Sequence, residues 1–170
     1  QWLLNWFKNV SMIRPHLQVR MPSFDYTDEE WNDLISYFQQ KDNLDLIYED
    51  PHNFTLNSSS FKAGERIAEM GACINCHFYG EEKPKQDALT WAPNLVLTKE
   101  RLRPEWLVEW FINPQDVMPG TKMPAPYIPT EEPQNSIREV WGSDVAKISR
   151  DSTKLYKSLI DWMWGMEGRK

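Results

Sequence analysis

The sequence has little cysteine and no long apolar run. Only two of the 170 residues are cysteines, Cys73 and Cys76. No stretch of apolar residues is long enough to cross a bilayer, so we expect no transmembrane segment in this chain. The chain also opens without an initiating methionine or a basic leader. We therefore expect a fragment or a processed product of a parent protein, with any signal or membrane anchor upstream.

An excess of positive charge is missing too. The formal net charge is −6, which argues against a nucleic-acid partner, since such partners are usually met by a basic face. A net negative charge would instead attract the chain electrostatically to a protein partner that has a basic docking face. Hydrophobic residues make up 41% of the chain, which predicts a globular core. Nine tryptophans suit either the lining of a flat apolar cofactor or ordinary core packing.

The two cysteines stand in a Cys-x-x-Cys-His pattern, because His77 follows Cys76 directly. Two thiols separated by two residues on a turn can form thioether bonds with two edges of one porphyrin. The next side chain is then carried under the iron, where an imidazole nitrogen can ligate it. The pattern therefore favours a covalently attached haem c.

A cysteine pair at this spacing can also serve as a redox motif, a zinc site or a disulfide. A thioredoxin-like redox motif should open a helix in a βαβ pattern, which the surrounding sequence does not show. A structural zinc site needs four ligands, and only the distant His16 and His52 could join the cysteines. We expect these two histidines to be ordinary surface or loop residues. A plain disulfide leaves His77 unexplained.

Helical patterns dominate the chain. Ser58-Ser59-Ser60 predicts the cap of a helix over about 61–70 that Gly71 ends. Thr98 is expected to precede a helix through 103–111, which Asn113-Pro114 ends. A last helix is predicted from about 151 to 163, and the proline-rich segment 118–129 is expected to be irregular.

The sequence also contains an internal repeat. Three blocks recur in the same order: residues 2–9 and 106–113, Met21-Pro22 and Met123-Pro124, and residues 33–38 and 158–163. Thr27 and Glu30 form a plausible capping box for the helix that ends near Gln40. Residues 1–42 are thus predicted to be the second half of a unit, residues 43–60 a linker, and residues 61–170 a complete copy. An insertion at about 130–150 is expected to be a surface loop.

The sequence resembles the class I c-type cytochromes, whose haem is ligated by histidine and methionine. The motifs that carry the resemblance are Cys73-Ile74-Asn75-Cys76-His77, Ala92-Pro93-Asn94-Leu95 and Pro119-Gly120-Thr121-Lys122-Met123-Pro124. The resemblance covers about the last hundred residues in full and the first forty as a half copy. It implies an all-α cytochrome c-like domain around a covalently bound haem, preceded by a partial cytochrome c-like helical unit.

The resemblance also implies a set of site residues. Cys73 and Cys76 would form the thioethers, with His77 as proximal and Met123 as distal iron ligand. The Pro93 carbonyl would accept the other imidazole N–H of His77.

Further roles follow from the same resemblance. Leu95 would pack on the haem face, and Gly64 would meet the last helix near Trp162. Met118 is a rival distal ligand, less favoured than Met123 because Met21 occupies the matching block of the repeat. Met21 would ligate a second haem if the parent protein has one. Arginines 101 and 103 either hold haem propionates or are solvated.

We expect the domain to act as an electron carrier and not as an enzyme. An iron saturated by histidine and methionine leaves no open position for a substrate. The chain would be a module of a larger dihaem or membrane-associated respiratory protein, located in the periplasm or otherwise outside the cytoplasm, with redox proteins as partners. Two alternatives stay open: a haem enzyme or gas sensor with a labile methionine, and a structural docking module.

Overall fold

The computed structural model describes residues 2–10, 21–42 and 50–166. The chain divides into two compact units, residues 1–51 and 52–170, which we call unit 1 and unit 2. The described part is mostly helical, and its only β structure is two isolated bridges, from His77 to Ala92 and from Tyr79 to Glu82. The all-α expectation is therefore confirmed at the level of secondary structure. Among the described residues, no helix is long and apolar enough to cross a membrane.

Unit 1 contains two helices, α1 (Trp2–Lys8) and α2 (Asp28–Lys41). The capping box at the start of α2 is present as predicted: Thr27 Oγ1 accepts the Glu30 amide at 3.3 Å, and the Thr27 amide donates to Glu30 Oε2 at 2.8 Å. Phe7 and Trp31 form the buried contact between the helices. Residues 11–20, which include His16, lie outside the described residues.

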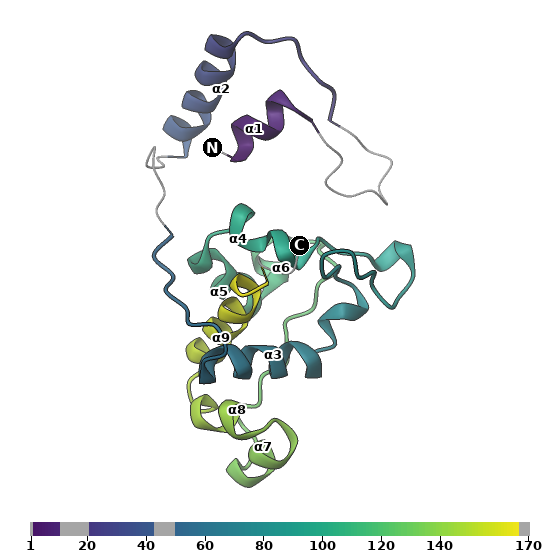
Figure 1. Cartoon of the computed structure of the whole chain (residues 1–170), viewed down its shortest axis with the longest axis vertical. Helices are drawn as coiled ribbons and strands as arrows, with labels where there is room; N and C mark the ends of the chain where they lie inside the picture. Colours follow the sequence, from purple (N-terminus) through teal and green to yellow (C-terminus); the bar gives the residue numbers. More distant parts are fainter. Residues whose placement is uncertain (1, 11–20, 43–49, 167–170) are drawn as a thin grey trace. The chain divides into compact units, whose positions relative to one another are not determined.

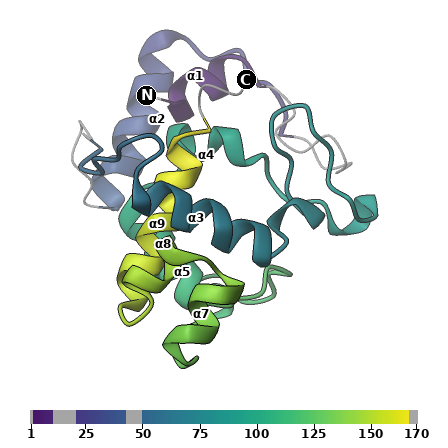
Figure 2. The ribbon, with the colours of Figure 1, turned by 60° about the horizontal axis from the view of Figure 1, so that its bottom comes forward.

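The core of unit 2 forms where α3 (Ser59–Met70) lies across α9 (Ser152–Trp164), as Figure 1 and Figure 2 show. A Cβ atom on Gly64 would lie 1.8 Å from the Ser158 carbonyl oxygen, so only glycine allows this close crossing. The expected crossing is therefore present, although the backbone at Ser158, one turn before Trp162, forms the contact. Both helices have side-chain caps: Ser58 accepts from the Phe61 amide and Asp151 accepts from the Lys154 amide.

The remaining elements of unit 2 are short. They are η1 (Cys73–Asn75), η2 (Ala88–Thr90), η3 (Leu95–Leu97), α4 (Thr98–Arg101), α5 (Pro104–Ile112), α6 (Pro114–Val117), α7 (Gln134–Val140) and α8 (Ser143–Ile148). Thr98 begins α4 and does not precede α5 directly, because Arg103 is the N-cap of α5 and Pro104 its first residue. The segment 118–129 contains no helix, as its prolines predicted.

The insertion at 130–150 is not a surface loop. It forms α7 and α8, and α8 packs against α3 (Figure 2). Ile137 and Val145 have no exposed surface, and Trp141 is buried. The insertion therefore contributes to the core. The sequence did not predict this, because α7 and α8 have only 7 and 6 residues, too few for a clear helical pattern.

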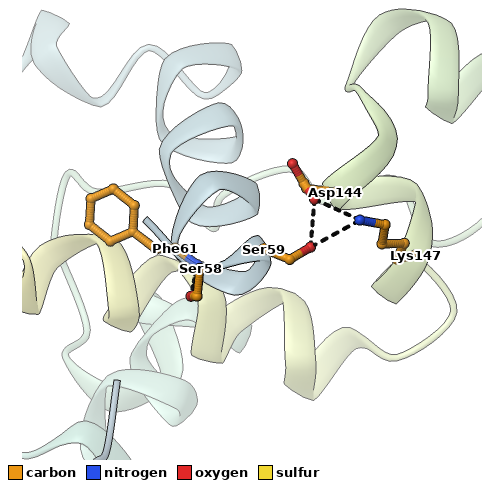
Figure 3. Close-up of polar contacts among 5 residues, drawn as sticks. All are labelled: Ser58, Ser59, Phe61, Asp144 and Lys147. Carbon is orange, nitrogen blue, oxygen red and sulfur yellow. Dashed lines mark hydrogen bonds and ion pairs between the residues drawn. The ribbon is translucent and has the colours of Figure 1, made fainter. Parts of the chain in front are cut away.

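Polar contacts fasten α8 to the first turn of α3 (Figure 3). The Ser59 hydroxyl donates to Asp144 Oδ1 at 2.5 Å, and Lys147 Nζ donates to the same oxygen at 3.0 Å. The hydrogen bond from Ser59 and the charge of Lys147 hold the pKa of Asp144 below its ordinary value. The first turn of α3 is thus fastened to α8.

Residues 52–58 belong to unit 2, although the sequence places them in the linker. His52 Nε2 lies 2.6 Å from Asp161 Oδ1 on α9, and the two side chains are only 12% and 10% exposed. Phe54 packs against the core. His52 lies in an irregular segment, as expected of a loop histidine, but its ring is not on the surface, because it contacts the buried Asp161 carboxylate.

Candidate functional site

The two cysteines lie on one tight turn after α3. Gly71 ends the helix with ordinary right-handed angles, and Ala72 takes the left-handed conformation, with φ of 50°. The amides of Cys76 and His77 then both donate to the Cys73 carbonyl, at 3.2 and 2.9 Å. This turn holds both thiols and the imidazole within one short segment, as a thioether attachment requires.

The thiols do not resemble those of a redox-active pair. Both cysteines are free thiols in the structure. Burial raises the pKa of the Cys73 thiol to about 11, with a smaller contribution from the neighbouring Cys76. Reactive Cys-x-x-Cys thiols have a lowered pKa because the thiolate is the nucleophile. The environment of Cys73 therefore argues against a thioredoxin-like role.

His77 is oriented by the backbone carbonyl of Pro93. Its Nδ1 lies 2.7 Å from the Pro93 oxygen, which is the contact that the resemblance to c-type cytochromes implied. A ring that donates through Nδ1 keeps the lone pair on Nε2 for a metal. Burial lowers the pKa of His77, and the hydrogen bond to Pro93 opposes this shift. The lowered pKa favours the neutral imidazole, which is the form that ligates metals.

A short parallel pairing holds Pro93 beside His77. The Ala92 amide donates to the Cys76 carbonyl at 2.7 Å, and the Leu95 amide donates to the Phe78 carbonyl at 2.9 Å. These two bonds lie on either side of the contact between His77 and Pro93 along both segments. The register of the pairing therefore fixes which carbonyl faces the imidazole.

Asn94 secures this pairing with its side chain. Its Oδ1 accepts from the Gly80 amide at 3.0 Å and from the Val96 amide at 3.3 Å, and its Nδ2 donates to the Gly80 carbonyl at 2.9 Å. Gly80 has φ of 65°, which favours glycine at this turn. The sequence alone did not point to these two residues, although Asn94 stands inside one of the three motifs that carry the resemblance.

The two candidate methionine ligands, Met123 and Met118, differ in burial. Met118 is 55% exposed, whereas Met123 is half-buried and packs against the core of unit 2. Trp110 Nε1 donates to the Met123 sulfur at 2.9 Å. A thioether sulfur has two lone pairs, so one remains for a metal. Trp110 belongs to the first block of the repeat, but no sequence pattern predicts that it contacts Met123.

The loop before Met123 is held by Gln115 on α6. Gln115 Oε1 accepts from the Gly120 amide at 3.2 Å, and its amide nitrogen donates to the Thr121 carbonyl. The Thr121 hydroxyl in turn accepts from the Met123 amide at 3.4 Å. These contacts fix the Pro-Gly-Thr-Lys-Met segment without regular secondary structure, and they give Gln115 a positioning role that the sequence did not predict.

The other candidate residues occupy varied positions. Leu95 is buried and belongs to the core, and Met21 is half-buried just before α2 in unit 1. Arg101 ends α4 and is half-buried, whereas Arg103 is exposed. An open pocket of about 480 Å³ lies beside α3, and its lining includes Ile74 and Trp162 but neither the two cysteines nor His77 nor Met123.

The residues present fit a covalently attached haem. They supply two free thiols, an imidazole oriented by a carbonyl, and a half-buried thioether. Cys73 and Met123 both pack against the cluster that contains Leu95. The zinc alternative is not supported in the described part of the chain, where no group of three or more histidine, cysteine, aspartate or glutamate residues could hold a metal. No protein-family model matches the chain, and no curated protein or solved structure is significantly similar to it.

Proposed function

We propose that this chain is an electron-transfer c-type cytochrome that carries one haem c on unit 2. Cys73 and Cys76 would hold the porphyrin through thioether bonds, and His77 Nε2 and the Met123 sulfur would bind its iron. The contact between His77 Nδ1 and the Pro93 carbonyl is the observation that carries the proposal. This hydrogen bond orients the imidazole so that Nε2 is available to a metal. A thiol redox site does not need an oriented imidazole.

The chain's residues favour a carrier over an enzyme. When bound, the haem supplies a one-electron couple, and a thioether ligand favours ferrous iron. The Met123 loop is fastened by Gln115 and its sulfur is held by Trp110, so the methionine is restrained at its position. With His77 and Met123 both bound to the iron, no coordination position would be left for a substrate.

The same proposal assigns a location and a partner class. Thioether attachment in bacteria takes place outside the cytoplasmic membrane, so the protein acts in the periplasm or another extracytoplasmic space. Its net charge of −6 suits a redox partner with a basic docking face. It serves as a module of a larger dihaem or membrane-associated respiratory protein.

The two methionines give a matched test of the proposal. The chain is produced in a bacterium with the c-type maturation machinery, and its ferric spectrum and redox potential are measured. We expect the ferric protein to show the sulfur-to-iron absorption band near the red edge of the visible spectrum. We also expect a reversible one-electron wave in voltammetry. Met123→Ala removes the band and lowers the potential, whereas Met118→Ala changes neither.

Two results would contradict the carrier function. If the band is absent from the unmodified protein and carbon monoxide or cyanide binds rapidly, a haem enzyme or gas sensor is the better assignment. If Met123→Ala leaves the spectrum, the potential and electron delivery unchanged, the haem has no redox role that depends on Met123, and a structural docking module is favoured.

A further inference from the structure

The indole of Trp110 contacts a sulfur and not an oxygen acceptor. Its Nε1 lies 2.9 Å from the Met123 sulfur, which is as short as a typical N–H···O bond. Trp91 gives a comparison within the same unit, because its Nε1 donates at 2.9 Å to an ordinary acceptor, the Gln86 carbonyl. A thioether is a weak acceptor, and the indole nitrogen is a donor only. The proton of Trp110 is thus directed at the one atom of Met123 that can bind a metal.

Helix α5 and a second tryptophan fix the position of this indole. Leu107 and Phe111 bury one side of α5 in the core, with only 3% and 6% of their surface exposed. Trp106 lies one helical turn before Trp110 and stacks on it, with ring centroids 5.0 Å apart and an interplanar angle of 17°. Both tryptophans and Met123 pack against the core of unit 2. The N–H group of Trp110 therefore has a fixed direction toward the sulfur.

A hydrogen bond to a ligating sulfur affects the two oxidation states of an iron unequally. Ferric iron carries one more positive charge than ferrous iron, so it depends more on the electron pair that the sulfur donates. An N–H group on the other lone pair withdraws electron density from the sulfur, and it places the positive end of its dipole beside the ligand. Both effects favour the ferrous state. Hydrogen bonds around the ligands are one of the ways in which a protein sets the potential of a haem.

We propose that Trp110 raises the redox potential of the haem through its hydrogen bond to the Met123 sulfur, and that Trp106 is a positioning residue that holds the indole for this bond. This inference rests on the proposed function of unit 2. It adds that the potential of the carrier depends on two side chains of α5 that are not iron ligands.

The test compares matched variants of the full chain with its haem attached. Trp110→Phe keeps an aromatic ring that can stack on Trp106 but removes the N–H group. At a fixed solution potential, we expect its ratio of ferrous to ferric protein to fall about threefold or more, as loss of one hydrogen bond predicts. The sulfur-to-iron band should remain, because Met123 still ligates. Trp91→Phe removes an indole hydrogen bond of the same length and should leave the ratio unchanged.

Variants of Trp106 test the positioning role. Trp106→Ser removes the stacking partner but leaves the N–H group of Trp110 in place, so we expect a partial fall in the same ratio. Trp106→Phe supplies an aromatic partner again and should return the ratio to that of the unmodified protein. A Trp106→Ser protein that is less stable in denaturant but has an unchanged ratio would contradict the positioning role, because packing alone would then explain the contact.

A second measurement follows the hydrogen bond itself and does not require the Trp110→Phe protein to fold. The indole N–H proton of Trp110 is assigned by isotope labelling and nuclear magnetic resonance in the ferrous protein. It should exchange slowly with solvent, and Met123→Ala should speed this exchange about tenfold or more, because the acceptor is gone. The exchange of the Trp91 indole proton should be the same in both proteins.

Three outcomes would overturn the inference. An unchanged ratio in Trp110→Phe shows that the N–H group does not set the potential. An equal fall in Trp91→Phe shows that the effect is not specific to the sulfur. Exchange of the Trp110 proton that ignores Met123→Ala shows that the haem-loaded protein lacks the bond. The band of the unmodified protein is recorded first: its absence counts against the proposed function, whereas its presence with an unchanged ratio counts against this inference alone.

Discussion

Asn94 joins the two segments that orient the candidate iron ligand. Its side chain makes three hydrogen bonds, two to Gly80 and one to the Val96 amide. The pairing that they secure keeps the Pro93 carbonyl beside His77. The sequence predicted the contact between His77 and Pro93 through the resemblance, but it did not predict what holds the carbonyl in place. Asn94 and Gly80 are 14 residues apart, and no local pattern reports a contact across such a distance.

Replacing Asn94 by alanine should therefore destabilise the protein and loosen the histidine. Loss of the side-chain bonds leaves backbone groups of Gly80 without their partner, at a cost of about 2 kcal/mol in the free energy of unfolding. Asn94→Asp keeps the acceptor oxygen and should lose about half as much. Denaturant unfolding of the haem-loaded protein measures both changes. Equal stability of all three proteins would show that the side chain does not secure the pairing.

A second prediction at the scale of single residues concerns how the stability of the protein depends on pH through Asp144. The Ser59 hydroxyl and Lys147 lower the pKa of Asp144 below its ordinary value of 3.8. A lowered pKa in the folded state means that the contact stabilises the protein above pH 3.8, and that this stability is lost as the pH falls through the folded-state pKa.

Ser59→Ala should therefore cost about 0.5–1 kcal/mol in unfolding free energy at neutral pH, since the bond lies near the surface. The difference from the unmodified protein should shrink in acid, where Asp144 is protonated. Asp144→Asn, which cannot titrate, is the control and should remove the pH dependence of the difference. An effect of Ser59→Ala that is the same at all pH values would contradict the assigned contact.

At the scale of elements, the sequence predicted α2, α3, α5 and α9 well but did not predict α7 and α8. α3, α2 and α9 carry Ser, Thr or Asp caps followed by apolar residues at helical spacing, and their observed bounds lie within about two residues of those predicted. α7 and α8 have only 7 and 6 residues and no side-chain cap. Their helical state depends on burial of Ile137 and Val145, which is a tertiary effect.

The crossing of α3 and α9 is the contact most sensitive to a single methyl group. A Cβ atom at position 64 would lie 1.8 Å from the Ser158 carbonyl oxygen, and backbone cannot move aside cheaply. Gly64→Ala should cost about 3 kcal/mol or more in unfolding free energy. Lys62→Ala, an exposed change on the same helix, should stay within about 0.5 kcal/mol. A Gly64→Ala protein as stable as the unmodified one would show that the helices do not approach this closely.

At the scale of the whole molecule, the chain forms two compact units. That the first is half of a repeat and the second a complete copy stays a prediction from the sequence. The boundary between residues 51 and 52 falls inside the predicted linker, because His52 and Phe54 contact unit 2. No sequence pattern shows that a loop histidine will meet Asp161, which is more than a hundred residues away. The proposed covalent chemistry, by contrast, depends on a pattern of five consecutive residues.

The most direct test of that chemistry is the mass of the denatured protein. The chain is matured in a bacterium that attaches haem c, unfolded, and examined by intact mass spectrometry together with a pyridine haemochrome spectrum. We expect the polypeptide mass plus one haem, a haemochrome typical of two thioether bonds, and loss of both in a variant with Cys73 and Cys76 replaced by alanine. A colourless chain with the bare polypeptide mass would contradict the haem site and the electron-transfer function that depends on it.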